Sequence, residues 1–171
     1  MAIKAGDYRV LLDDCVSDEF LSKYKAVIAY LNNGVYPDGS EGYAALRGEI
    51  FIHLDEIQED LVDVVGMDFI DSLRAGVFGA FIFLKRYQRG YVLQHIDTGV
   101  FYQAACLNTP LDSLVDEYSV ITTALIPYAN GLVCDGLVLS HQTLLGKNMA
   151  KEARDGYWAA KRSGHLITSI F

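Results

Sequence analysis

The chain has 171 residues, of which 51% are hydrophobic and 21% charged, and its formal net charge is −8. That length suits one domain with a core of its own, and the hydrophobic share excludes general disorder. No run of about 18 apolar residues suggests a membrane span, and the first ten residues lack the apolar run of a signal peptide. We therefore expect a cytoplasmic protein.

Charge is unevenly distributed along the chain. Residues 1–75 hold 15 acidic and 6 basic residues, a net of −9, whereas residues 76–171 hold 7 acidic and 8 basic residues, a net of +1. This asymmetry predicts two parts with different surfaces, an acidic part over 1–75 and a second part over 76–171, within one compact unit.

The acidic part has the apolar spacing of helices. Ser17 or Asp18 is a suitable cap for a first helix that ends before the Asn-Asn-Gly sequence at 32–34. A second helix is predicted over 40–65, with Gly66 as its stop, and a short third helix over 68–75.

From Gly76 onward the sequence changes to short aromatic and β-branched runs separated by turn residues. The predicted strands are 79–87, 90–96, 99–107, 118–127, 131–139 and 165–171. Asn130-Gly131 is the best hairpin sequence, because both residues tolerate positive φ. Residues 76–84 fit a buried helix as well as a strand.

One further helix is predicted over 146–162, with Met149, Ala153, Trp158 and Ala159 or Ala160 available to pack. The expected class is therefore α+β. A helical N-terminal part packs on a mostly antiparallel sheet of about five or six strands, and the helix over 146–162 covers one face of that sheet.

Four segments of the C-terminal half resemble the motifs of a known domain: FIFLKRYQRGYVLQH, YQAACLNTPLDSL, ALIPYANGLVCDGLVL and AAKRSGHLITSI. With them, residues 79–170 resemble a domain of bacterial proteins of unknown function. The resemblance implies a strand pair, a hairpin of the pattern Pro-Phe/Tyr … Ile-Tyr-Asp-Gly-Leu, and a closing helix that ends in Gly-x-Ile-Thr-Ser. Cys134 stands where that hairpin has Tyr. The resemblance also implies a bacterial or phage cytoplasmic origin, and it supplies no catalytic residue.

The second predicted helix carries an acidic stripe, in which Glu49, His53, Glu56 and Asp60 share one face beside Glu59 and Asp63. Like charges four residues apart disfavour a helix, so a cation is one explanation. Glu49, His53 and Glu56 are then the candidate metal ligands. The alternative is a solvated face, or one that meets bases of the same fold or of a partner. We expect no metal or organic cofactor.

Two basic clusters are candidate interaction residues. Lys147, Lys151 and Arg154 share one helix face, and Lys85, Arg86 and Arg89 lie near a hairpin with Tyr87 and Tyr91 interleaved. Bases among aromatic residues are typical of single-stranded nucleic acid binding. The acidic whole chain disfavours that interpretation, because phosphates repel it.

Motifs for nucleophilic catalysis and for phosphate binding are absent from the sequence. Cys15, Cys106 and Cys134 are widely spaced, and we expect all three to be buried thiols. A catalytic pair of Cys106 or Cys134 with His95 or His141 has no motif to support it.

We expect a non-enzymatic protein-interaction or regulatory module, since the 11 tyrosines suit an interface. One alternative is an enzyme whose site is assembled from Asp135, His141 and Lys161. The other is a nucleic-acid-associated protein that uses the C-terminal basic face. The expected partner is a protein or a second copy, with a homodimer favoured. The uncharged run 165–171 would pair with another strand if it lay at a sheet edge.

Overall fold

The computed structural model describes residues 10–170, in which four α-helices, one short 3-10 helix and six strands are found. The helices are α1 (Asp14–Leu31), α2 (Gly39–Val65), α3 (Met67–Ala75), η1 (Leu111–Ser113) and α4 (Lys147–Ser163). The strands are β1 (Val77–Tyr87), β2 (Gly90–His95), β3 (Phe101–Cys106), β4 (Ser119–Tyr128), β5 (Gly131–Cys134) and β6 (Leu139–Leu144). The α+β class is confirmed, and the chain changes from helix to strand at Gly76.

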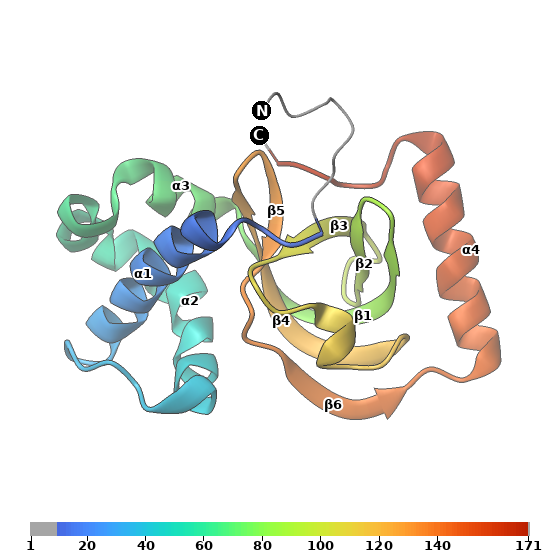
Figure 1. Ribbon diagram of the computed structural model, residues 1–171, viewed down its shortest axis with the longest axis horizontal. Helices are drawn as coiled ribbons and strands as arrows, with labels where there is room; N and C mark the ends of the chain where they lie inside the picture. Colours follow the sequence, from blue (N-terminus) through green and yellow to red (C-terminus); the bar gives the residue numbers. More distant parts are fainter. Residues whose placement is uncertain (1–9, 171) are drawn as a thin grey trace.

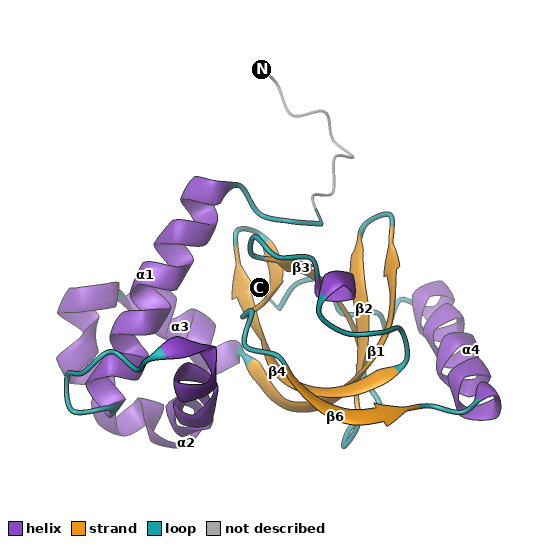
Figure 2. Ribbon diagram, turned by 60° about the horizontal axis from the view of Figure 1, so that its bottom comes forward, coloured by secondary structure: helices purple, strands orange, loops and turns teal. Residues whose placement is uncertain are grey.

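Five of the strands form a closed barrel. Their order is β1-β2-β3-β5-β4, and β1 also pairs with β4, which closes the ring, while β6 is added alongside β4. Among these strands only β3 and β5 are parallel. Figure 2 shows the strands curving around a common interior between the helical part and α4.

Three apolar clusters hold together the helical part, the barrel and α4, which lie side by side in that order (Figure 1). The helices α1–α3 pack on the outer face of the barrel against Ala124, Ile126 and Val133. Every second side chain along a strand points into the barrel, as Ile121 and Leu125 of β4 do, and these side chains fill the interior. On the other side α4 packs against the outer face of β1–β3. Because both faces of β4 are covered, residues 123–127 are all buried.

Residues 76–84 are ambiguous from sequence alone, and the structure shows a strand from Val77 onward. The helical interpretation fails because this segment pairs on both sides, with β2 and with β4. The hairpin at 128–131 is present as predicted. Its two turn residues are Ala129 and Asn130, both with positive φ, and Gly131 already belongs to β5.

Two predicted strands were wrong in extent. The strand expected over 131–139 ends at Cys134, and a separate strand, β6, follows at 139–144. The segment 165–171 makes a single parallel bridge, Ile167 with Tyr102 of β3, instead of a strand. It runs beside β3 for too short a distance to form a ladder. Phe171, the last residue of the strand predicted over 165–171, lies outside the described residues. Residues 1–9 of the predicted acidic part also lie outside them.

Three packing predictions also need correction. Helix α1 begins at Asp14 with Asp13 as N-cap, so Ser17 is a buried residue of the helix rather than its cap. Cys15 is exposed, because it lies on the outer side of the first turn of α1. On α4, Ala153 and Tyr157 are buried, whereas 58% of Met149 and 38% of Trp158 is exposed.

None of the helices in residues 10–170 combines the length and the apolar character needed to span a membrane.

Gly90, the first residue of β2, offers a test of the barrel packing. A Cβ added there would lie 2.9 Å from the Ala104 carbonyl oxygen and 3.0 Å from Gln103 Cγ. Because backbone cannot yield easily, we expect Gly90→Ala to lower the free energy of unfolding by about 1–3 kcal/mol in urea titrations. Gly146→Ala is the control, since its added methyl group meets nothing within 4 Å. Equal, small effects of the two substitutions would contradict the β2–β3 packing.

Candidate functional site

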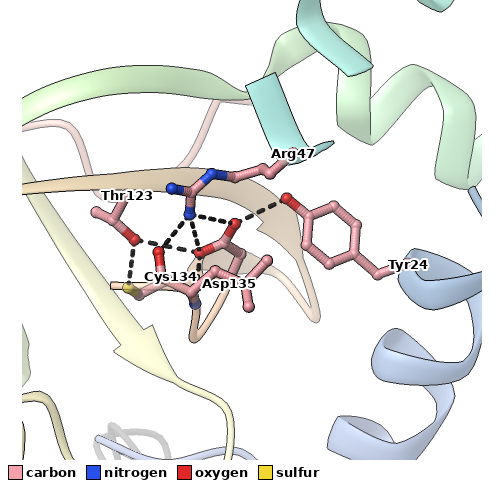
Figure 3. A network of polar contacts seen from close by, with 6 residues as sticks. Tyr24, Arg47, Thr123, Cys134 and Asp135 are labelled. Atoms are coloured by element: carbon pink, nitrogen blue, oxygen red, sulfur yellow. Dashed lines mark hydrogen bonds and ion pairs between the residues drawn. The ribbon is translucent and has the colours of Figure 1, made fainter. Parts of the chain in front are cut away.

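A buried ion pair joins the helical part to the barrel. Arg47 of α2 places its Nη1 atom 3.0 Å from Oδ2 and 3.2 Å from Oδ1 of Asp135, the residue that follows β5. Both side chains are completely buried. Arg47 Nη1 also donates to the Leu137 carbonyl oxygen. Figure 3 shows this pair between α1, α2 and the barrel strands.

Neutral groups complete the shell around Asp135. The Tyr24 hydroxyl of α1 donates to Oδ2 at 2.7 Å. The Thr123 hydroxyl of β4 lies 3.2 Å from Oδ1, and the Leu137 backbone N–H donates to Oδ1 at 3.0 Å. Each carboxylate oxygen therefore accepts at least two hydrogen bonds. Such a carboxylate organises structure and has no free lone pair suited to general-base catalysis.

The same shell perturbs Tyr24. Burial raises the pKa of this hydroxyl well above its ordinary value, and the adjacent Asp135 carboxylate raises that pKa further. Arg47 also places its guanidinium over the Phe78 ring, 5.0 Å from the centroid. Its Nε and Nη2 atoms have no hydrogen-bond partner among the described residues. The Arg47 charge is thus balanced by one carboxylate and one aromatic face.

An open cleft lies over this cluster, between the helical part and the barrel. Its volume is about 560 Å³, and Tyr24 and Asp135 are among its lining residues. The walls are mainly apolar, with Leu21, Ile28 and Leu137 prominent, and Lys25 lies at the cleft with its ammonium over Tyr43. Its size and its place at the junction of two parts are typical of a binding site.

The three residues of the predicted enzyme site are not assembled. Asp135 is saturated by structural hydrogen bonds, and it faces the helical part. His141 lies on exposed β6 and is bonded to Thr122, whereas Lys161 lies on α4 over the Trp158 ring. Figure 1 shows α4 on the opposite side of the barrel from the helical part, so Lys161 cannot act on a group bound beside Asp135.

The acidic stripe of α2 is real, but its geometry suits an ion pair more than a metal. His53 lies between two carboxylates, with Nε2 3.0 Å from Glu49 and Nδ1 3.1 Å from Glu56. The two carboxylates therefore approach opposite ring nitrogens and do not point at a shared position. In residues 10–170 no group of three His, Cys, Asp or Glu side chains is arranged to hold a metal ion.

The two basic clusters are partly brought together. Tyr87 of β1 packs against Tyr157 and Trp158 of α4, with ring centroids 4.8 and 5.8 Å apart. Lys85 lies over the Tyr87 ring, so the end of β1 and the second half of α4 share one surface. Arg86 instead faces Asp112 at 4.0 Å. Tyr91, which the sequence interleaves with these bases, is buried in the barrel interior and is not part of this surface.

The cysteine–histidine pairs that no motif supported are not formed by these residues. His95 bonds Thr98 and packs edge-on against Phe81, while His141 is held by Thr122. Cys106 and Cys134 are buried, as predicted, and they are neighbours of each other rather than of a histidine.

Sequence reasoning missed Arg47 and Tyr24. Arg47 occupies the buried stripe of α2, which otherwise consists of apolar residues such as Ala44, Ile50 and Leu54. A single arginine at such a position is the pattern that could have indicated a buried acidic partner. Tyr24 has no comparable feature, since an aromatic residue in an apolar stripe is ordinary.

Comparisons with known proteins add nothing to this geometry. No protein-family model matches the chain, and neither the curated proteins nor the solved structures include a significant match.

The ion pair predicts a large and specific cost of substitution. Asp135→Asn preserves size but leaves the Arg47 charge buried without a counter-charge, so we expect a loss of about 3–5 kcal/mol in the free energy of unfolding. Asp97→Asn, at an exposed turn, is the control and should change stability by less than about 0.5 kcal/mol. Urea denaturation measures both. A loss below about 1 kcal/mol for Asp135→Asn would show that the pair is not buried as described.

The raised pKa of Tyr24 predicts alkaline sensitivity. Above pH of about 10 the unfolded chain releases the tyrosine proton while the folded chain retains it, so stability falls as pH rises. Tyr24→Phe removes this ionisable hydroxyl. Between pH 10 and 12 we expect the free energy of unfolding of the variant to fall less steeply than that of the wild type, by about 1.4 kcal/mol per pH unit. Tyr36→Phe, at an exposed position, should keep the wild-type slope. Parallel curves for all three proteins would refute the assignment.

Proposed function

We propose that this chain is a non-enzymatic protein-interaction module whose first partner is a second copy of itself. The observation that supports this most directly is the position of its charges. Residues 14–75 contain 13 acidic and 4 basic residues, a net of −9, whereas α4 contains 5 basic and 2 acidic residues, a net of +3. The helical part and α4 lie at opposite ends of the longest axis (Figure 1).

The two charged ends cannot neutralise each other within one molecule, because the barrel separates them. In the described part of the chain, no carboxylate lies within ion-pair distance of the five cations of α4. The Glu59 and Asp63 side chains of α2 are exposed at the acidic end. Two copies lying side by side in opposite directions would bring each acidic end beside the partner's basic end. Such a pair is a closed two-fold dimer, the commonest oligomer.

Exposed apolar side chains accompany the charges at both ends. On α2, 69% of Ile52 and 64% of Val64 is exposed, and on α4 the same holds for 58% of Met149 and 38% of Trp158. Surface ion pairs alone contribute only about 0–1 kcal/mol each. Apolar contact between the two helix faces would supply the remaining affinity, and the charges would determine the orientation.

The alternative functions are less well supported. An enzyme would need Asp135, His141 and Lys161 in one place, whereas Asp135 is buried beside the helical part, His141 lies on β6 and Lys161 lies on α4. Nucleic acid binding by five-stranded OB-type barrels uses the outer face of strands 2 and 3. Here Val92 and Phe101 of that face are covered by Ala153 and Tyr157 of α4. The resemblance of residues 79–170 to a bacterial domain of unknown function adds no activity.

Light scattering tests the proposal. At an ionic strength of about 0.02 M we expect twice the 18.9 kDa mass of the chain, falling toward the monomer at about 0.5 M, where exposed charges are screened. A chain that stays monomeric at every salt and protein concentration would refute self-association.

A charge exchange tests the orientation. We expect Lys147→Glu/Lys151→Glu/Arg154→Glu and Glu59→Lys/Asp63→Lys each to be monomeric alone, and an equimolar mixture of the two to form a heterodimer. In that mixture both contacts are again between opposite charges. Asp97→Lys, at a turn away from both helices, is the control and should remain dimeric. Dimers that persist at high salt and in both variants would contradict the charge pairing but retain self-association.

A further inference from the structure

The narrowest part of the barrel wall is the pairing between β3 and β5. These strands share only two register pairs, Ala105 with Val133 and Cys106 with Cys134. Toward its N-terminal end, β3 is instead bonded to Ile167 of the C-terminal segment. The wall of the barrel is therefore closed at this point by a short parallel pairing that ends in two free cysteines.

The two cysteines are placed for direct contact. Partners in neighbouring strands face the same side of a sheet, and both side chains belong to the barrel interior. Adjacent strands lie about 4.8 Å apart, which falls within the Cα separation of about 4.4–6.8 Å that a disulfide requires. The strand spacing therefore satisfies the Cα requirement of a disulfide between these residues.

The surroundings of the pair distinguish the two thiols. The neighbouring Cys134 thiol, together with burial, holds the pKa of Cys106 above its ordinary value. The neighbouring Cys106 thiol in turn lowers the pKa of Cys134. The Thr123 hydroxyl lies 3.2 Å from Cys134 Sγ. Cys134 is therefore the thiol that a proton leaves more readily.

A cavity of about 450 Å³ lies against the outer face of this pairing, where Ala105 and Val133 are among its lining residues. Cys106 and Cys134 face the opposite side, the barrel interior. Both thiols are buried, so larger reagents are excluded.

We propose that Cys106 and Cys134 are an oxidant-sensitive pair that a small peroxide converts into a disulfide between β3 and β5. In the first step the Cys134 thiolate attacks one peroxide oxygen and the O–O bond breaks, which leaves Cys134 as a sulfenic acid. The departing hydroxide takes up the proton that the thiol released and becomes the first water molecule. In the second step the Cys106 thiol attacks the sulfenic sulfur, forming the S–S bond and releasing a second water. Two thiols are oxidised and one hydrogen peroxide is reduced. A dithiol reductant reverses the change by exchange.

Mass spectrometry of the folded protein tests the proposal. In a Cys15→Ser background, which removes the exposed third thiol, hydrogen peroxide should lower the mass of the tryptic peptide 90–147 by about 2 Da. Both cysteines lie in that peptide. Alkylation after unfolding in urea should label two thiols before oxidation, none after it, and two again after reduction.

Variants with one cysteine provide the control. Cys106→Ser should leave Cys134 as a sulfenic acid that dimedone traps, without any loss of mass. If this variant does not fold, the peptide from the Cys15→Ser protein still decides the question. Two thiols that remain alkylatable after peroxide treatment, or a peptide that only gains oxygen, would overturn the proposal. Since none of these readouts depends on oligomeric state, failure here leaves the proposed dimer untouched.

Discussion

The buried pair of Arg47 and Asp135 is the interaction on which the arrangement of this protein depends. It joins residues 88 positions apart in the sequence, one on a helix and one at the end of a barrel strand. An unpaired charge at either position would be very costly, whereas the pair itself adds little net stability compared with apolar residues of the same volume. We infer that its main effect is on orientation. The helical part can pack on the barrel in only one way that satisfies both charges.

That constraint determines what surrounds it. Tyr24 and Thr123 are held by Asp135, so α1 and β4 are positioned by the same carboxylate. The cleft between the helical part and the barrel is lined in part by Tyr24 and Asp135. Cys134, the residue before Asp135, is bonded to Thr123 and paired with Cys106. The short β3–β5 pairing and the ion pair are therefore neighbours, and a chemical change at the thiols would be adjacent to the groups that orient the helices.

The surface charges are arranged differently from the buried pair. Among the described residues the buried charges of Arg47 and Asp135 are paired, whereas exposed carboxylates of α2 and the cations of α4 lie at the two ends of the molecule (Figure 1). Intramolecular pairing would have required the helical part and α4 to be adjacent, and the barrel keeps them apart. An acidic protein with one basic end is suited to contacts with a partner of opposite polarity, and a second copy has that polarity at each end.

Local pattern alone determined a good part of this fold. Apolar residues at helical spacing predicted α2 nearly to both ends and α1 at its C-terminal end, and Asn130 with its neighbours predicted the β4–β5 hairpin, because turn and helix geometry depend on residues a few positions apart. Tertiary structure decided the rest. The partner of Arg47, the parallel pairing of Cys106 with Cys134, the separate strand β6 and the single bridge at Ile167 all join distant residues. Periodicity shows which side of an element is buried, but it does not show which other element covers that side, and the site exists only where those elements meet.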